Sequence, residues 1–172
     1  MRLKDDVMEL LRQGSESVLA ELVAADRRAV RPLMARLWDT DEVIRRRAAR
    51  AIGRAAAVHA DLGTSLIRRL MWALNDESAT NGVHGLAALG EIGRQAPERL
   101  APFIPGLASM ARDDGLRLEL LRAFEAVAES APDLVKPHLP DLEQHVDDSR
   151  PEEREAFHGL AEATGTAVAN EC

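Results

Sequence analysis

An internal repeat of about 35 residues constrains the fold of this chain more than any other feature. Three prolines recur at an offset of 35, as the pairs Pro97/Pro132, Pro102/Pro137 and Pro105/Pro140. A second marker, Ala followed by Ile, Leu or Phe, stands at 51–52, 88–89, 123–124 and 156–157. Self-similarity at such a period is typical of proteins whose units cannot bury an apolar face alone and therefore stack on one another. We predict one elongated core that successive units share.

Each repeat unit is predicted to contain two helices. The second helix of the third unit carries an apolar stripe at helical spacing, made of Leu116, Leu120, Leu121, Phe124, Val127 and Ala128. In the fourth unit, Pro132 stands where a first helical turn tolerates proline, because the N–H there has no helical partner. The run Ser149-Arg150-Pro151-Glu152 has the form of a capping box and predicts where the last helix begins. Aromatic residues make up only 3% of the chain, which disfavours strands.

These markers predict a single domain over residues 1–172, a length that one domain usually has. Its parts are an N-terminal cap at 1–25, repeat units at 26–59, 60–95, 96–130 and 131–165, and a frayed tail at 166–172. The cap carries apolar residues such as Val7, Leu11 and Leu22, which predict a capping helix or hairpin. The polar stretch 75–82 is predicted to be a loop.

The first two units resemble HEAT repeats. The residues that carry the resemblance are Pro32-Leu33, Leu37-Trp38-Asp39, Val43-Ile44-Arg45-Arg46 and Ala51-Ile52-Gly53 in the first unit, and Leu70, Leu74, Asp76, Val83 and Ala88-Leu89-Gly90 in the second. The third and fourth units depart from the pattern, with Glu125 and His158 at the glycine position. The resemblance covers about residues 26–165, and the chain is also similar to small bacterial HEAT-repeat proteins of uncharacterised function.

The resemblance implies an all-α fold, namely a right-handed α-α superhelix, or α-solenoid. It would contain about four HEAT-like helical hairpins and the N-terminal capping helix or hairpin. In this family the second helices line a concave surface, which most often binds a protein or acts as a scaffold.

Charge is distributed unevenly along the chain, whose formal net charge is -7. Residues 27–69 contain eleven Arg and four acidic residues, whereas residues 87–172 contain eight Lys or Arg and 17 acidic residues. On the predicted second helices, positions outside the apolar stripe form rows that read Arg47, His84, Glu119 and Glu152, then Arg50, Arg122 and Glu155, then Arg54 and Glu91. The concave surface is therefore expected to grade from basic to acidic, and these nine residues are the candidate partner-binding residues.

We predict a non-catalytic protein-interaction or scaffold module that binds another protein on this surface. The basic residues of the first unit would meet acidic groups of the partner, and replacing Arg47, Arg50 or Arg54 should leave the packing intact. Two alternatives remain open: an anion or nucleic acid bound by the Arg45–Arg54 cluster, and a lyase or accessory enzyme domain of the HEAT-like kind. The net negative charge makes nucleic acid the less expected partner.

No catalytic residue, metal site or cofactor is predicted. The sequence contains no nucleophile elbow, no dinucleotide fingerprint and no Walker motif. None of the five histidines is followed by Glu or lies three or four residues from another, and Cys172, whose role is left open, is the only cysteine. The run Gly90-Glu91-Ile92-Gly93 is interpreted as a helix-packing pair, and Trp38 and Trp72 as core or edge packing.

Membrane association is not expected. The longest apolar run, residues 70–74, is far shorter than the roughly 20 residues that cross a bilayer. The first six residues lead into no apolar segment of a secretory signal. These features predict a cytoplasmic protein.

Overall fold

The computed structural model describes residues 2–75 and 82–166, and over these residues the fold is all-helical with no strand, as predicted. The helices are α1 (Leu3–Gln13), α2 (Glu16–Ala25), α3 (Val30–Arg36), α4 (Glu42–Val58), α5 (Ala60–Leu74), α6 (Gly85–Gln95), α7 (Pro97–Leu100), α8 (Ile104–Ser109), α9 (Arg117–Ala128), α10 (Pro132–Val135), α11 (Leu139–Glu143) and α12 (Pro151–Ala163). Short 3-10 turns, η1 (Arg27–Ala29), η2 (Ala101–Phe103), η3 (Met110–Arg112) and η4 (Lys136–His138), join some of them.

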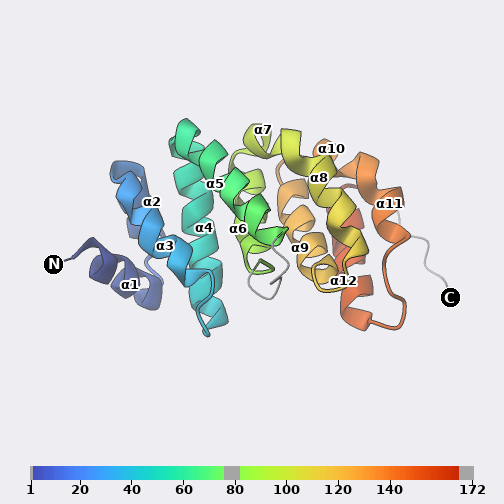
Figure 1. The fold of residues 1–172 in the computed structure, drawn as a ribbon, viewed down its shortest axis with the longest axis horizontal. Helices are drawn as coiled ribbons and strands as arrows, with labels where there is room; N and C mark the ends of the chain where they lie inside the picture. The colour runs from blue at the N-terminus through green and yellow to red at the C-terminus, as the bar shows by residue number, and fades with distance from the viewer. Residues whose placement is uncertain (1, 76–81, 167–172) are drawn as a thin grey trace.

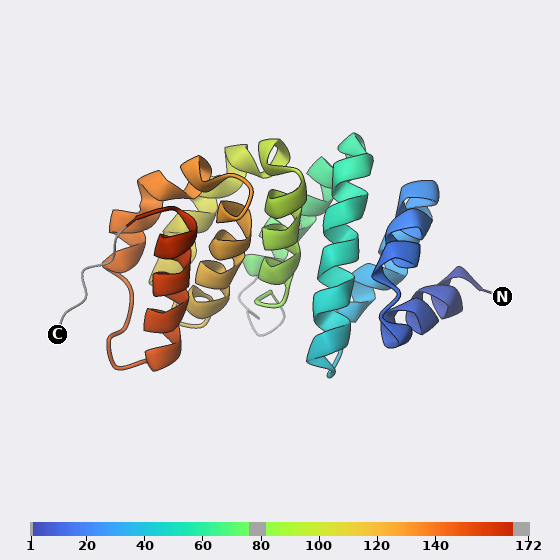
Figure 2. The same ribbon diagram turned by 180° about the vertical axis from the view of Figure 1, so that it is seen from behind.

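The longer helices pack in chain order. Helix α2 contacts α4, α4 contacts α6, α6 contacts α9, and α9 contacts α12. These five helices form the row in front in Figure 2. Figure 1 shows the opposite side, where α3, α5, α8 and α11 lie in front and where α1 and α11 lie at opposite ends of the molecule.

One cluster of buried apolar side chains runs through the molecule from Val7 on α1 to Leu160 on α12. All six residues of the stripe predicted on α9 are buried, and Phe124 is only 1% exposed. The helical periodicity of that segment was therefore interpreted correctly, because the face it marks is the face that packs.

Glycines allow α6 and α9 to approach each other closely. A Cβ atom at Gly90 would lie 2.9 Å from the Cα atom of Ala123, and one at Gly93 would lie 2.5 Å from Cγ2 of Val127. The interpretation of residues 90–93 as a helix-packing pair is confirmed.

The start of α12 differs from the predicted capping box. The helix begins at Pro151 and its cap residue, Arg150, makes no side-chain capping bond. The hydroxyl of Ser149 donates instead to Oδ1 of Asp147 at 2.6 Å. Glu153, not Glu152, turns inward, because a buried guanidinium, that of Arg117, lies 3.3 Å from its Oε2 atom.

Two further predictions concern exposed segments. Trp72 is 71% exposed, so the prediction that it packs in the core or at an edge is wrong. Most of the predicted loop at 75–82, and all but the first residue of the predicted tail at 166–172, lie outside the described residues. Within residues 2–75 and 82–166, no helix combines the length and the apolar character needed to cross a bilayer.

Candidate partner-binding surface

The predicted site residues lie on the row of helices α4, α6, α9 and α12 (Figure 2). Helix α4 carries Arg47, Arg50 and Arg54. Helix α6 carries Glu91, and His84 is its N-terminal cap residue. Helix α9 carries Glu119 and Arg122, and helix α12 carries Glu152 and Glu155. The repeat register therefore predicted the helices that bear these side chains.

An open groove with a volume of about 780 Å³ crosses α4, α6 and α9. We call it the α4–α6–α9 groove. Its lining includes five of the nine predicted residues: Arg50, His84, Glu91, Glu119 and Arg122. Small side chains from all three helices, Ala49, Ala87, Ala123 and Ala126, supply much of the remaining lining. A partner helix could approach such a surface closely, because alanine projects only a methyl group.

Positive charge is concentrated on one side of this groove. Helix α4 contributes Arg45, Arg46 and Arg50 together with one acidic residue, Glu42. Helix α6 contributes Glu91, and α9 contributes one acidic and one basic side chain. The basic excess therefore lies at the α4 side.

Several of these charges are paired within the molecule. The guanidinium of Arg50 lies 2.9 Å from the carboxylate of Glu16 and 3.9 Å from that of Glu91. Glu91 also pairs with Arg94 at 2.6 Å, and its hydrogen bond raises the pKa of Arg94 above the usual value for arginine. On α9, Arg122 pairs with Glu119 at 2.6 Å. The groove is thus lined by a network of ion pairs.

Arg47 has an internal partner that the sequence analysis did not anticipate. Its Nη1 atom donates to the carbonyl oxygen of Leu11 at 2.7 Å and to that of Arg12 at 3.2 Å. These carbonyls belong to the last turn of α1, where helical partners are missing. The expectation that Arg47 can be replaced without affecting packing is therefore wrong, because its side chain ties α1 to α4.

The remaining candidates lie outside the α4–α6–α9 groove. Arg54 is exposed and lines a smaller hollow of about 160 Å³ beside Arg47 and Arg50. Glu152 and Glu155 are exposed on α12 and line neither hollow. The structure thus separates the acidic end of the predicted surface from the groove.

Among the described residues, no three His, Cys, Asp or Glu side chains lie together in a way that could hold a metal ion. Cys172 lies outside them.

Sequence reasoning missed a groove on the opposite side of the molecule, between α3 and α5. Four arginines line it, Arg27, Arg28, Arg31 and Arg69. The signal available in the sequence was the excess of arginine over acidic residues in 27–69. That excess was assigned to the second helices, although these four residues belong to η1, α3 and α5.

Comparison with known proteins adds little. No protein-family model matches the chain, and no curated protein matches it. Among solved structures, the crystal structure of an engineered protein is 16% identical and covers 96% of this chain and 97% of its own, with a TM-score of 0.32. A likeness at that score carries no argument about fold or function.

Proposed function

We propose that this protein is a non-catalytic interaction module, a right-handed α-solenoid of HEAT-like hairpins that binds another protein across the α4–α6–α9 groove. The observation that supports this proposal most is the composition of the groove. Five of the nine side chains that the repeat register assigns to one surface line a single depression, together with small apolar side chains.

Repeated local geometry supports the solenoid. Ala96 and Ala131, which precede the proline of the third and fourth predicted units, have nearly the same backbone angles, φ -145° and ψ 65° in one and φ -143° and ψ 65° in the other. The turns η2 and η4 follow at matching positions. Equivalent sequence therefore has equivalent structure at an offset of 35 residues.

Binding would rest on charge complementarity around an apolar base, the usual anatomy of a protein interface. Acidic side chains of the partner would meet Arg46 and Arg50 on the α4 side. Basic side chains of the partner would meet Glu91 and Glu119.

The existing ion pair of Arg50 with Glu16 permits this exchange of partners on the α4 side. The side chains of Arg50 and Glu16 are 53% and 51% exposed, and exposed pairs typically contribute only about 0.2–1 kcal/mol. Replacing an internal pair by a pair with the partner therefore costs little.

Capture of partners from native lysate by the immobilised protein tests the proposal. The double variant Arg46→Glu/Arg50→Glu reverses two groove charges whose side chains are 65% and 53% exposed. We expect it to melt within a few degrees of the parent and to lose the proteins that the parent retains at low salt, since such charges govern association rate and salt dependence.

The matched control is Arg112→Glu/Arg154→Glu. It makes the same change in net charge at exposed positions outside the grooves described above, and it should capture what the parent captures. Equal capture by parent and groove variant would refute the proposed surface. Retention of duplex DNA by the parent with a steep salt dependence would favour the nucleic-acid alternative instead.

A further inference from the structure

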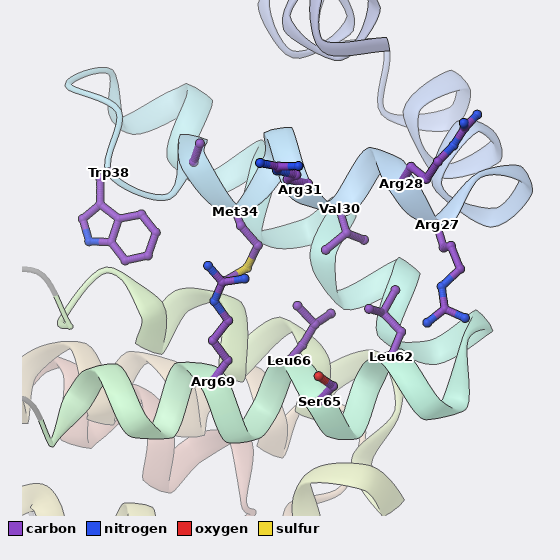
Figure 3. A pocket seen from close by; sticks show the side chains of 11 residues that line it. Arg27, Arg28, Val30, Arg31, Met34, Trp38, Leu62, Ser65, Leu66 and Arg69 are labelled. Carbon is purple, nitrogen blue, oxygen red and sulfur yellow. The ribbon is translucent and has the colours of Figure 1, made fainter.

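The groove between α3 and α5 is independent of the surface described above. It has a volume of about 670 Å³, and Figure 3 shows the side chains that line it. Met34 and Leu66 provide an apolar strip along its length, and Trp38 lies at one end. No carboxylate of the described residues lines it. We call it the α3–α5 groove.

Two of its four arginines already have carboxylate partners. The guanidinium of Arg27 lies 2.9 Å from the carboxylate of Asp61. Arg28 donates to both carboxylate oxygens of Asp26, at distances from 2.7 to 3.1 Å. These hydrogen bonds lower the pKa of Asp26 to about 2. Both arginines therefore neutralise charge within the molecule.

The other two arginines have no such partner. Arg31 and Arg69 make no hydrogen bond or ion pair with any residue that the structure describes. Figure 3 shows their guanidinium groups on either side of Met34, one from α3 and one from α5, with Trp38 at the end of the groove. Two positive charges that no described residue compensates thus flank an apolar strip beside an aromatic ring that is 38% exposed.

We propose that the α3–α5 groove binds an acidic amphipathic peptide segment of a partner protein. Its apolar side chains would rest on Met34 and Leu66, and its carboxylates would pair with Arg31 and Arg69. Guanidinium groups suit this role because they bind carboxylates through two parallel hydrogen bonds.

A nucleic-acid strand fits the groove less well. Nucleic-acid binding relies on many phosphate contacts, typically about 6–10 for a DNA-binding protein. In this groove, two arginines lack a carboxylate partner among the residues that the structure describes, and an apolar strip separates them.

A second copy of this chain is also a poor occupant. Its acidic half could supply carboxylates, but the exposed large apolar side chains of the described residues, Val18, Trp38, Val43, Val58 and Trp72, all lie in the other half. A second copy would therefore leave the apolar strip unfilled.

Fluorescence of Trp38 provides a direct test. The chain contains two tryptophans, so Trp72→Phe, which replaces a 71% exposed ring, leaves Trp38 as the single reporter. The probe is a synthetic peptide of about 12 residues that combines Glu with Leu and Phe, a length that spans roughly three helical turns. A second peptide carries Gln in place of every Glu.

We expect saturable changes in Trp38 emission with the Glu peptide, and affinity that falls as salt is added. The Gln peptide should bind at least about tenfold more weakly than the Glu peptide. The variant Arg31→Glu/Arg69→Glu, made in the Trp72→Phe background, should bind the Glu peptide at least about tenfold more weakly than its parent. The control Arg68→Glu/Arg112→Glu makes the same charge change at exposed positions outside the groove and should bind like the parent. Circular dichroism of each variant verifies its fold.

Four results would overturn the proposal. The first is the absence of a saturable response up to about 1 mM Glu peptide, and the second is an equal loss of binding in the control variant. The third is tighter binding of an oligothymidylate of similar length than of the peptide. The fourth is displacement of the peptide by inorganic phosphate at fixed ionic strength. Sedimentation of the parent as a dimer that Arg31→Glu/Arg69→Glu dissociates would assign the groove to a second copy.

Discussion

Arg117 on α9 and Glu153 on α12 carry opposite charges although they are only 5% and 2% exposed. The Nη1 atom of Arg117 lies 3.3 Å from Oε2 of Glu153, and its Nε donates to the carbonyl oxygen of Ala111 at 2.7 Å. Glu153 also accepts the backbone N–H of Asp147 at 3.0 Å and a bond from Arg150 at 3.1 Å. These bonds offset the cost of removing two charges from water, and they fix the approach of α12 to α9.

Replacing Glu153 by Ala should destabilise the protein by about 3–5 kcal/mol, the usual cost of removing one partner of a buried ion pair. The loss arises because the buried guanidinium of Arg117 keeps, among the described residues, only its exposed carboxylate partner Asp114. The backbone N–H of Asp147 and the side chain of Arg150 also lose this acceptor. Glu155→Ala, at an exposed position of the same helix, should cost less than about 0.5 kcal/mol. Urea unfolding followed by circular dichroism measures both values, and similar values would contradict the assignment.

The contact between α6 and α9 shows how small residues set the geometry of a helix pair. Gly90 faces the backbone of α9, with the carbonyl oxygen of Ala123 only 3.0 Å from the place where a Cβ atom would lie. Backbone atoms cannot move aside as the end of a long side chain can. The distance between these helices therefore depends on the absence of a side chain at this position.

Gly90→Ala should destabilise the protein by about 1–3 kcal/mol, the range for overpacking, even though alanine favours helix by about 1 kcal/mol. Gly106→Ala on α8 provides the control, because the nearest atom to its added Cβ would be Cε of Met71 at 3.8 Å. That variant should be as stable as the parent or more stable by up to about 1 kcal/mol. Thermal melts compare the two, and an equal effect would show that the α6–α9 contact is not close.

The continuous core makes the molecule a unit despite its repeated sequence. Buried apolar side chains connect every helix of the front row in Figure 2, from α2 to α12. In repeat proteins, the contacts between neighbouring units carry much of the stability. A defect at one contact should therefore affect parts of the chain far from it.

Phe124→Ala, in the buried stripe of α9, should cost about 3–5 kcal/mol. Circular dichroism at 222 nm reports on the whole chain, whereas tryptophan fluorescence reports on residues 38 and 72, in the other half. In the parent, we expect both probes to report the same urea midpoint, as in two-state unfolding. In the variant, both probes should again agree with each other, at a midpoint lower than that of the parent. An unchanged fluorescence midpoint in Phe124→Ala would show that the two halves unfold independently.

The sequence by itself determined the features that depend on local periodicity. The apolar stripe of α9, the helix start at Pro132 and the glycine pair of α6 were all predicted correctly. Each follows from a chemical preference expressed within a few residues: apolar spacing of three or four, a missing N–H, or a missing side chain. Repeat register also placed the charged residues of the candidate surface on the correct helices.

Only the tertiary structure decided which charged side chains meet. Arg47 reaches the end of α1, Glu153 rather than Glu152 turns inward to Arg117, and Arg31 of α3 and Arg69 of α5 line the same groove. Each of these relations joins residues more than 30 positions apart. Long charged side chains can reach in several directions, so their partners depend on how the helices pack. Sequence periodicity does not specify that packing.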